Sequence, residues 1–109
     1  MYYLKKQIEI SASHKLELDY DSPCKQLHGH NWILTLYLKS LKLNKNGMLT
    51  DFSAISEIIK NKIDHKNLNE VFDFNPTAEN IAKWVVENIG KCYKCDVQET
   101  EGNIASYEI

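Results

Sequence analysis

The chain has 109 residues, of which 43% are hydrophobic and 26% are charged, as expected for one globular domain with one core. Its formal net charge of −2 gives no electrostatic reason to expect binding to nucleic acid or to an anionic membrane. No apolar run approaches the ~20 residues of a membrane span, and we expect no signal peptide because the first residues lack an apolar segment. With three cysteines, we therefore expect a cytoplasmic protein whose thiols are free or bind metal.

Residues 2–14 show the alternation of a half-buried strand. Its apolar face consists of Ile8, Ile10, Ala12 and His14, and its polar face of Gln7, Glu9, Ser11 and Ser13. A histidine at the end of an apolar face can simply be a satisfied core residue. Residues 15–25 then form a polar loop that includes Cys24.

A second strand is predicted over residues 28–41, and it begins with two histidines on either side of a glycine. Since residues i and i+2 of a strand point to the same face, His28 and His30 present their imidazoles side by side, at the rim of the apolar face that contains Trp32. An isolated His-x-His is also compatible with a solvated strand end. Antiparallel pairing of the first two strands, however, would bring His14 beside both. Three imidazoles without a fourth protein ligand are typical of a catalytic zinc site with an open position.

The middle of the chain predicts two helices. Asn46-Gly47 indicates a tight turn, after which residues 48–52 are expected to return as a short strand. The first helix, with Ser53 as its N-cap, would cover the sheet and end near Asp64 and His65. Its buried stripe is predicted as Ile55, Ile58, Ile59 and Ile63. The following loop to Pro76 is long for a compact domain, which suggests a functional role.

The second helix is predicted to begin at Thr77 and to end at Gly90. Its buried stripe consists of Ala78, Ile81, Ala82, Val85 and Ile89. Two strands follow, joined by a turn at residues 101–103. The predicted order, ββααββ, gives an α+β fold: one domain over residues 1–109, with a four-stranded antiparallel sheet and two helices on one face.

The third strand contains one carboxylate and two cysteines of interest. Tyr93, Cys95, Val97 and Glu99 are predicted to share a face, so Glu99 ends an otherwise apolar face and is costly to bury without a partner. Cys92 and Cys95 are spaced like a redox or zinc pair. Positions three apart on a strand face opposite sides, however, and no second pair exists. We interpret these two cysteines as incidental.

Six motifs resemble, in this order, those of the 6-pyruvoyltetrahydropterin synthase/6-carboxytetrahydropterin synthase family. They are SASH at 11–14, Cys-x-x-x-His-Gly-His-Asn-Trp at 24–32, GMLTDF at 47–52, DHKNLN at 64–69, PTAENIA at 76–82 and QET at 98–100. The resemblance covers nearly the whole chain, and the combination is far more specific than any single motif. One departure is Trp32, where an aromatic of tyrosine type is commoner in the family.

The resemblance implies the tunnelling fold, in which three subunits close a β-barrel and two trimers stack into a homohexamer with active sites at subunit interfaces. It implies Zn²⁺ held by His14, His28 and His30, a catalytic thiol at Cys24, a proton-relay pair at Asp64 and His65, and a pterin-ring anchor at Glu99. Taken singly, these residues have ordinary explanations. Cys24 could be an incidental thiol, the Asp64-His65 pair a histidine at a helix end, and Glu99 an exposed strand carboxylate. Their joint occurrence favours the functional assignment.

The activity that the resemblance implies is zinc-dependent conversion of 7,8-dihydroneopterin triphosphate to 6-carboxy-5,6,7,8-tetrahydropterin, acetaldehyde and triphosphate, on the route to queuosine. The gap between Cys24 and His28 is similar to that of the bacterial 6-carboxytetrahydropterin synthases, whereas the pyruvoyl enzymes usually have a longer one. Two alternatives remain. One is a 6-pyruvoyltetrahydropterin synthase, which eliminates triphosphate from the same substrate, and the other is a non-enzymatic zinc-dependent assembly protein.

The predicted element lengths suggest that one active site draws on two chains. The second strand extends about 45 Å from the histidines at 3.3 Å per residue. The returning strand and the first helix each recover only about 16 Å. Asp64 and His65 would then fall short of Cys24 in their own chain, and the pair of a neighbouring subunit would reach it.

Overall fold

A five-stranded sheet with the strand order β3-β1-β2-β4-β5 forms the centre of the protein. The structure is a computed structural model that describes residues 1–109. β1 (Tyr2–His14) and β2 (His28–Ser40) form a long antiparallel pair whose register runs from Tyr2↔Ser40 to His14↔His28. β4 (Cys92–Thr100) pairs antiparallel with β2, and β5 (Asn103–Glu108) pairs antiparallel with β4. The predicted α+β class is confirmed.

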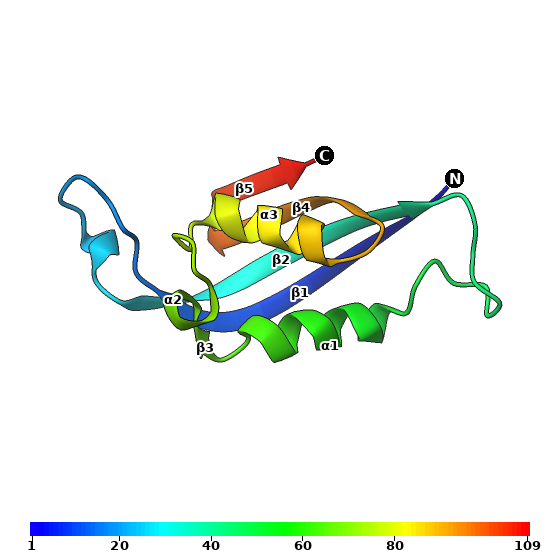
Figure 1. Cartoon of the computed structure of the whole chain (residues 1–109), viewed down its shortest axis with the longest axis horizontal. Helices are drawn as coiled ribbons and strands as arrows, with labels where there is room; N and C mark the ends of the chain where they lie inside the picture. Colours follow the sequence, from blue (N-terminus) through cyan, green and yellow to red (C-terminus); the bar gives the residue numbers. More distant parts are fainter.

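Both long helices cover the same face of this sheet (Figure 1). α1 (Phe52–Ile63) lies along β1, and α3 (Ala78–Asn88) packs on β4 and β5. The core between the layers contains Trp32, Leu34 and Leu36, which are fully buried. The opposite face has no helix on it, and residues such as Gln7 and Lys39 are exposed there. No helix of the chain combines the length and the apolar character that crossing a membrane requires.

The segment between α1 and α3 is structured, which corrects the expectation of a long loop and of a four-stranded, wholly antiparallel sheet. β3 (Lys66–Asn67) pairs parallel with β1 at Ala12 and Ser13. The short helix α2 (Leu68–Val71) follows directly, with Leu68 fully buried. A strand of two residues is too short for an alternating pattern to reveal it in the sequence.

Residues 48–52 do not form the predicted return strand, because the chain there makes a loop that leads into α1. Gly47, at φ 80°, makes the predicted turn. The N-cap of α1 is Asp51, whose side chain accepts a hydrogen bond from Ser53 N at 2.8 Å, so the prediction of Ser53 as the cap was wrong. Ile58 is 54% exposed instead of buried, so only every fourth position of the predicted stripe, starting at Ile55, enters the core.

A β-bulge changes which side chains of β4 face the core. The β2–β4 register shifts between Tyr37 and Leu38, so that Leu38 lies opposite Cys92. Cys92 and Cys95 are therefore both buried and free, and the prediction that they face opposite sides was wrong. Tyr93 lies instead against Tyr37 on the uncovered face, with ring centroids 6.4 Å apart. An inserted residue of this kind resets the two-residue period of a strand.

α1 returns the chain to the histidine end of β1, so the length estimate that left Asp64 and His65 short of that end was wrong. Near the start of the helix, the Phe52 ring lies 5.8 Å from Lys6 Nζ. From there α1 advances about 18 Å at 1.5 Å per residue. The stretch of β1 from Lys6 to Ser11 covers about 17 Å. His65 N accordingly donates a hydrogen bond to Ser11 O at 2.7 Å.

Candidate metal centre

The three predicted histidines converge where β1 ends and β2 begins. His14 lies opposite His28 in the antiparallel register, and His30 lies opposite Ala12. The ring centroids are 4.6 Å apart for His14 and His28, 5.2 Å for His14 and His30, and 4.7 Å for His28 and His30. The register alone therefore produces a compact group of three imidazoles.

Backbone carbonyls fix the protonation of two of these rings. His14 Nδ1 donates to Pro76 O at 2.8 Å, and His28 Nδ1 donates to Gln26 O at 2.7 Å. Because a carbonyl oxygen can only accept, the proton of each neutral ring lies on Nδ1, and Nε2 has a free lone pair. A backbone carbonyl bonded to the second ring nitrogen is the usual environment of a metal-binding histidine.

Two of the Nε2 atoms have no partner of their own. His14 Nε2 and His30 Nε2 are buried and make no hydrogen bond. Leaving a buried polar atom unpaired costs about 1–3 kcal/mol, so such atoms call for an explanation. A metal ion bound by both nitrogens would satisfy them, and the residues present therefore fit a metal site.

Glu99 joins the same group. A second β-bulge, between Gln98 and Thr100, places Glu99 at the irregular end of β4. Its Oε1 lies 3.2 Å from His30 Nε2, although the contact lacks hydrogen-bond geometry. Ligand atoms of the three histidines and Glu99 all lie within 4.8 Å of one another. The sequence placed Glu99 at the end of the face that contains Cys95 and Val97, and the β2–β4 register, which pairs Val97 with Leu34, brings the end of that face to His30.

The electrostatics of the centre favour neutral imidazoles. Burial lowers the pKa of His14 and His30, while the negative charge of Glu99 acts in the opposite direction on both. For His14 the hydrogen bond to Pro76 also opposes the effect of burial. A neutral imidazole is the form that binds metal. The donor set, with nitrogen and oxygen but no thiolate, suits a borderline divalent cation such as Zn²⁺.

Cys24 lies in the loop between β1 and β2, on the short helix η1 (Pro23–Lys25). Ser22 caps this helix, because its Oγ accepts from Cys24 N at 3.2 Å. Leu16 N donates to Cys24 O at 2.8 Å, which ties the loop to the continuation of β1. The thiol is free and half-buried, and it is not among the four grouped ligands.

Asp64 and His65 lie at the outer edge of β1, next to Ser11. Asp64 Oδ1 accepts from Ser11 N at 3.0 Å, and Asp64 Oδ2 lies 3.7 Å from His65 Nε2. His65 has a left-handed backbone (φ 58°), and its side chain is 83% exposed. Within one chain neither residue hydrogen-bonds to Cys24, so the structure pairs the carboxylate with the imidazole but does not join the pair to the thiol.

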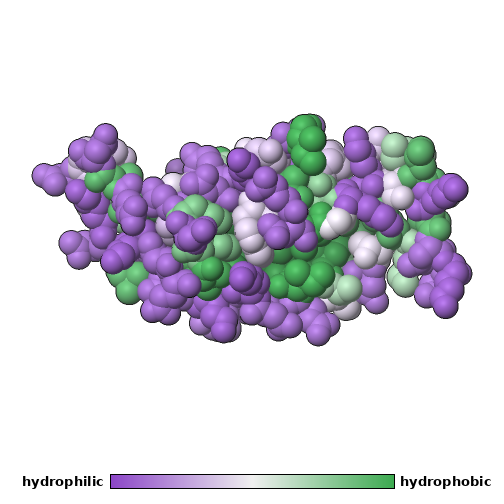
Figure 2. All heavy atoms as spheres, viewed as in Figure 1, coloured by the Kyte–Doolittle hydropathy of each residue, from purple (hydrophilic) through white to green (hydrophobic).

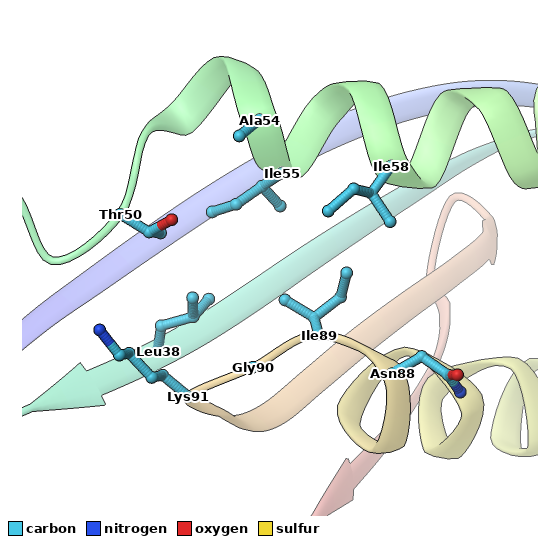
Figure 3. Close-up of a pocket in the computed structure, with 9 residues that line it drawn as sticks. All are labelled: Leu38, Thr50, Ala54, Ile55, Ile58, Asn88, Ile89, Gly90 and Lys91. Carbon is cyan, nitrogen blue, oxygen red and sulfur yellow. The ribbon is translucent and has the colours of Figure 1, made fainter.

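A separate apolar hollow of about 230 Å³ lies between α1 and α3. Ile55 and Ile58 of α1 face Leu38 and Ile89 across it (Figure 3), and apolar atoms are visible over this region of the surface (Figure 2). Its lining includes no histidine, carboxylate or thiol, and Lys91 Nζ already donates to Leu49 O at 3.2 Å. The chemistry therefore belongs to the histidine centre and not to this hollow.

Comparisons with known proteins identify the family of the chain. A family model described as 6-pyruvoyl tetrahydropterin synthase matches residues 3–109. The chain is 29% identical over 121 residues to the 6-carboxy-5,6,7,8-tetrahydropterin synthase of Synechocystis sp., covering 98% of this chain and 93% of that protein. It is 33% identical over 92 residues to the dihydroneopterin monophosphate aldolase of Pyrococcus furiosus, covering 82% and 75%. Alignments with two further curated relatives span only 43% and 65% of those proteins.

The fold is also similar to that of solved structures. The 6-pyruvoyl tetrahydropterin synthase of Caenorhabditis elegans superposes with a TM-score of 0.78, at 24% sequence identity, over 99% of this chain and 95% of that one. At this level of identity the match establishes the arrangement of strands and helices.

Proposed function

The chain belongs to the 6-pyruvoyl tetrahydropterin synthase family, and on this premise we propose that it is a zinc-dependent 6-carboxy-5,6,7,8-tetrahydropterin synthase. The reaction converts 7,8-dihydroneopterin triphosphate to 6-carboxytetrahydropterin, acetaldehyde and triphosphate, in the cytoplasm and on the route to queuosine. The observation that carries the proposal is the group of three imidazoles in which His14 Nε2 and His30 Nε2 are buried without a partner. The Synechocystis relative, aligned over nearly its full length, has this name.

His14, His28 and His30 hold the zinc ion in this proposal. When bound, the ion supplies a positive charge that polarises a side-chain oxygen of the substrate and acidifies the neighbouring C–H group. The carbonyl oxygens of Pro76 and Gln26 keep the protons of His14 and His28 on Nδ1, which leaves the Nε2 lone pair of each neutral ring free for the metal. No protein thiolate belongs to the cluster, which leaves Cys24 free for proton transfer.

Cys24, Asp64 and His65 move protons in this proposal. A thiolate near a cationic centre has a lowered proton affinity and can act as a general base. The Ser11 backbone holds Asp64 Oδ1, which leaves Oδ2 on the side of the His65 ring. A carboxylate in this position orients an imidazole and stabilises its protonated form.

Glu99 anchors the pterin ring. The guanidine-like edge of a pterin presents parallel N–H donors, and one carboxylate can accept two of them. A polar hollow of about 320 Å³ adjoins Glu99, with Glu79 and Asn103 also in its lining. Glu99 belongs both to this hollow and to the group of metal-binding side chains, which supports the assignment.

The active protein is a homohexamer, a dimer of trimers, with sites shared between subunits. β5 and the first part of β1 leave open edges at the two sides of the sheet, and open edges are usually paired or covered. Since Cys24 makes no hydrogen bond with Asp64 or His65 of its own chain, a neighbouring chain's pair completes the site. Mixed and reassembled Cys24→Ala and His65→Ala chains should regain activity. Dead mixtures, with wild type recovering under the same treatment, would place both residues in one chain.

The activity is tested by incubating the zinc-loaded protein with 7,8-dihydroneopterin triphosphate and identifying the product by mass spectrometry. The proposal predicts 6-carboxytetrahydropterin and acetaldehyde. A 6-pyruvoyl product would indicate the pyruvoyl synthase instead. Turnover of the monophosphate but not the triphosphate would favour the activity named for the Pyrococcus furiosus relative. A zinc-bound protein that turns over neither pterin would be an assembly protein.

A further inference from the structure

We propose that Asn69 and Asn75 are positioning residues, which hold the loop of Cys24 against the metal centre. The proposal rests on the function given above for Cys24. It concerns two side chains that neither bind the metal nor belong to the proton-transfer residues.

Each asparagine side chain pairs with the whole backbone of one residue just beyond His14. Asn69 Oδ1 accepts from Lys15 N at 2.8 Å, and Asn69 Nδ2 donates to Lys15 O at 2.9 Å. Asn75 makes the same two bonds with Glu17 N and Glu17 O, each at 3.0 Å. A primary amide provides one acceptor and two donors, so it can replace the peptide groups of a neighbouring strand. Two amides thus continue the edge that β3 begins.

The residue between these two contacts connects to Cys24. Leu16 N donates to Cys24 O at 2.8 Å. In an extended chain the backbone groups of successive residues point to opposite sides. Lys15 and Glu17 therefore face the asparagines, while Leu16 faces the thiol loop. Fixing Lys15 and Glu17 therefore fixes Leu16 between them, and with it the backbone of Cys24.

The same segment also holds a metal ligand. Asn75 precedes Pro76, whose carbonyl oxygen accepts from His14 Nδ1 at 2.8 Å. Asn75 O itself accepts from Asn80 Nδ2 at 2.9 Å, and Asn80 is in the first turn of α3. The start of α3 thus holds both the hydrogen-bond partner of the His14 ring and, through Glu17 and Leu16, the backbone of Cys24. The sequence showed these asparagines within and beside two motifs but gave them no role.

The test compares zinc-loaded Asn69→Ala and Asn75→Ala proteins with wild type and with Asn44→Ala. Asn44 is a matched control, since its Oδ1 also fixes a loop backbone, accepting from Asn46 N at 2.9 Å and Met48 N at 3.1 Å, beyond the opposite end of β2. Two readouts are taken: kcat and KM with 7,8-dihydroneopterin triphosphate, and the rate at which iodoacetamide alkylates Cys24 in the folded protein. Peptide mapping identifies the modified cysteine.

The expected result is a loss in kcat of about ten-fold or more for both variants, because a small displacement of a reacting group strongly lowers the rate of the chemical step. KM and zinc content stay near the wild-type values, and alkylation of Cys24 becomes faster because the released loop exposes the thiol. Asn44→Ala leaves both readouts unchanged.

Unchanged kcat and alkylation in Asn69→Ala and Asn75→Ala would overturn the proposal, and so would equal effects of Asn44→Ala. The alkylation rates decide even if wild type forms no product, since they need no substrate. That outcome would remove the proposed function without touching the positioning role. If Asn75→Ala does not fold, Asn69→Ala and the isosteric Asn75→Asp, which lacks the Nδ2 donor to Glu17 O, decide the question.

Discussion

Each histidine of the metal centre is held by a different part of the chain. His14 is fully buried and bonded to Pro76 O, at the start of α3. His28 is bonded to Gln26 O in the loop before β2, and His30 contacts Glu99 of β4. Because these supports come from separate elements, the imidazoles keep their places without a metal. We infer that the site is largely preformed and that metal binding adds little to the folding of the core.

Replacing His28 tests the ligand assignment. We expect about one zinc per chain in wild type and little in His28→Ala, because two remaining imidazoles do not make a catalytic zinc site. The variant should stay folded, since His28 is only half-buried. His65→Ala is the control, because it removes an exposed histidine outside the cluster and should keep its zinc. Metal analysis and circular dichroism measure both points, and full zinc occupancy in His28→Ala would remove His28 from the ligand set.

Glu99 lies close enough to the histidines to bind either the substrate or the metal. If it anchors the pterin, Glu99→Gln keeps its zinc and loses substrate affinity. Losing one charge-assisted hydrogen bond of about 1.5–3 kcal/mol corresponds to roughly a ten-fold to hundred-fold weaker affinity. Zinc content and the Kd of a pterin ligand separate the roles. Zinc loss with unchanged pterin binding would make Glu99 a metal ligand.

Among the secondary-structure elements, alternation predicted the long strands well and irregular pairing poorly. The apolar faces of residues 2–14 and 28–41 imply the β1–β2 register, and with it the meeting of His14, His28 and His30. The bulges in β4 depend on how two strands fit together, which no single strand encodes. The bulge between β2 and β4 decides where Cys92 points, and the sequence therefore misplaced Cys92, whereas Glu99 lies beyond that bulge on the predicted face of Cys95 and Val97.

The position of β4 in the core makes its two cysteines unreactive. Burial raises the pKa of both Cys92 and Cys95, so at neutral pH neither forms the thiolate that reacts with disulfide reagents. We expect only Cys24 to react rapidly with Ellman's reagent in the native protein, and all three thiols to react after unfolding. Cys24→Ser should abolish the rapid phase. Rapid reaction of a second thiol in the native protein would show that β4 opens or is placed differently.

The molecule as a whole is elongated, with extents of 52 × 26 × 24 Å, and its sheet has an open edge strand on each side. The sequence predicted one α+β domain but overestimated the distance between the end of α1 and the histidines. The estimate from element lengths implied that a loop and a helix were too short to return along the 13-residue strand β2 to the histidines. In the structure Asp64 and His65 lie at the same end of the sheet as Cys24, and a second chain can complete the site there.

The open edges predict the assembly state. We expect light scattering at micromolar concentration to give six times the 12.7 kDa chain mass, because pairing β5 with β1 of neighbouring copies removes both edges. A trimer would support the barrel without the stacking of two rings. A 12.7 kDa monomer would contradict both the assembly and the shared active site.

X-ray absorption at the zinc edge distinguishes a zinc ion held by three imidazoles, with the thiol of Cys24 free, from one that the thiol also binds. We expect nitrogen or oxygen neighbours at about 2.0–2.1 Å, with imidazole scattering from three rings and no sulfur. A sulfur neighbour at about 2.3 Å would place Cys24 on the metal. That result would contradict the open three-histidine site and remove the proposed base.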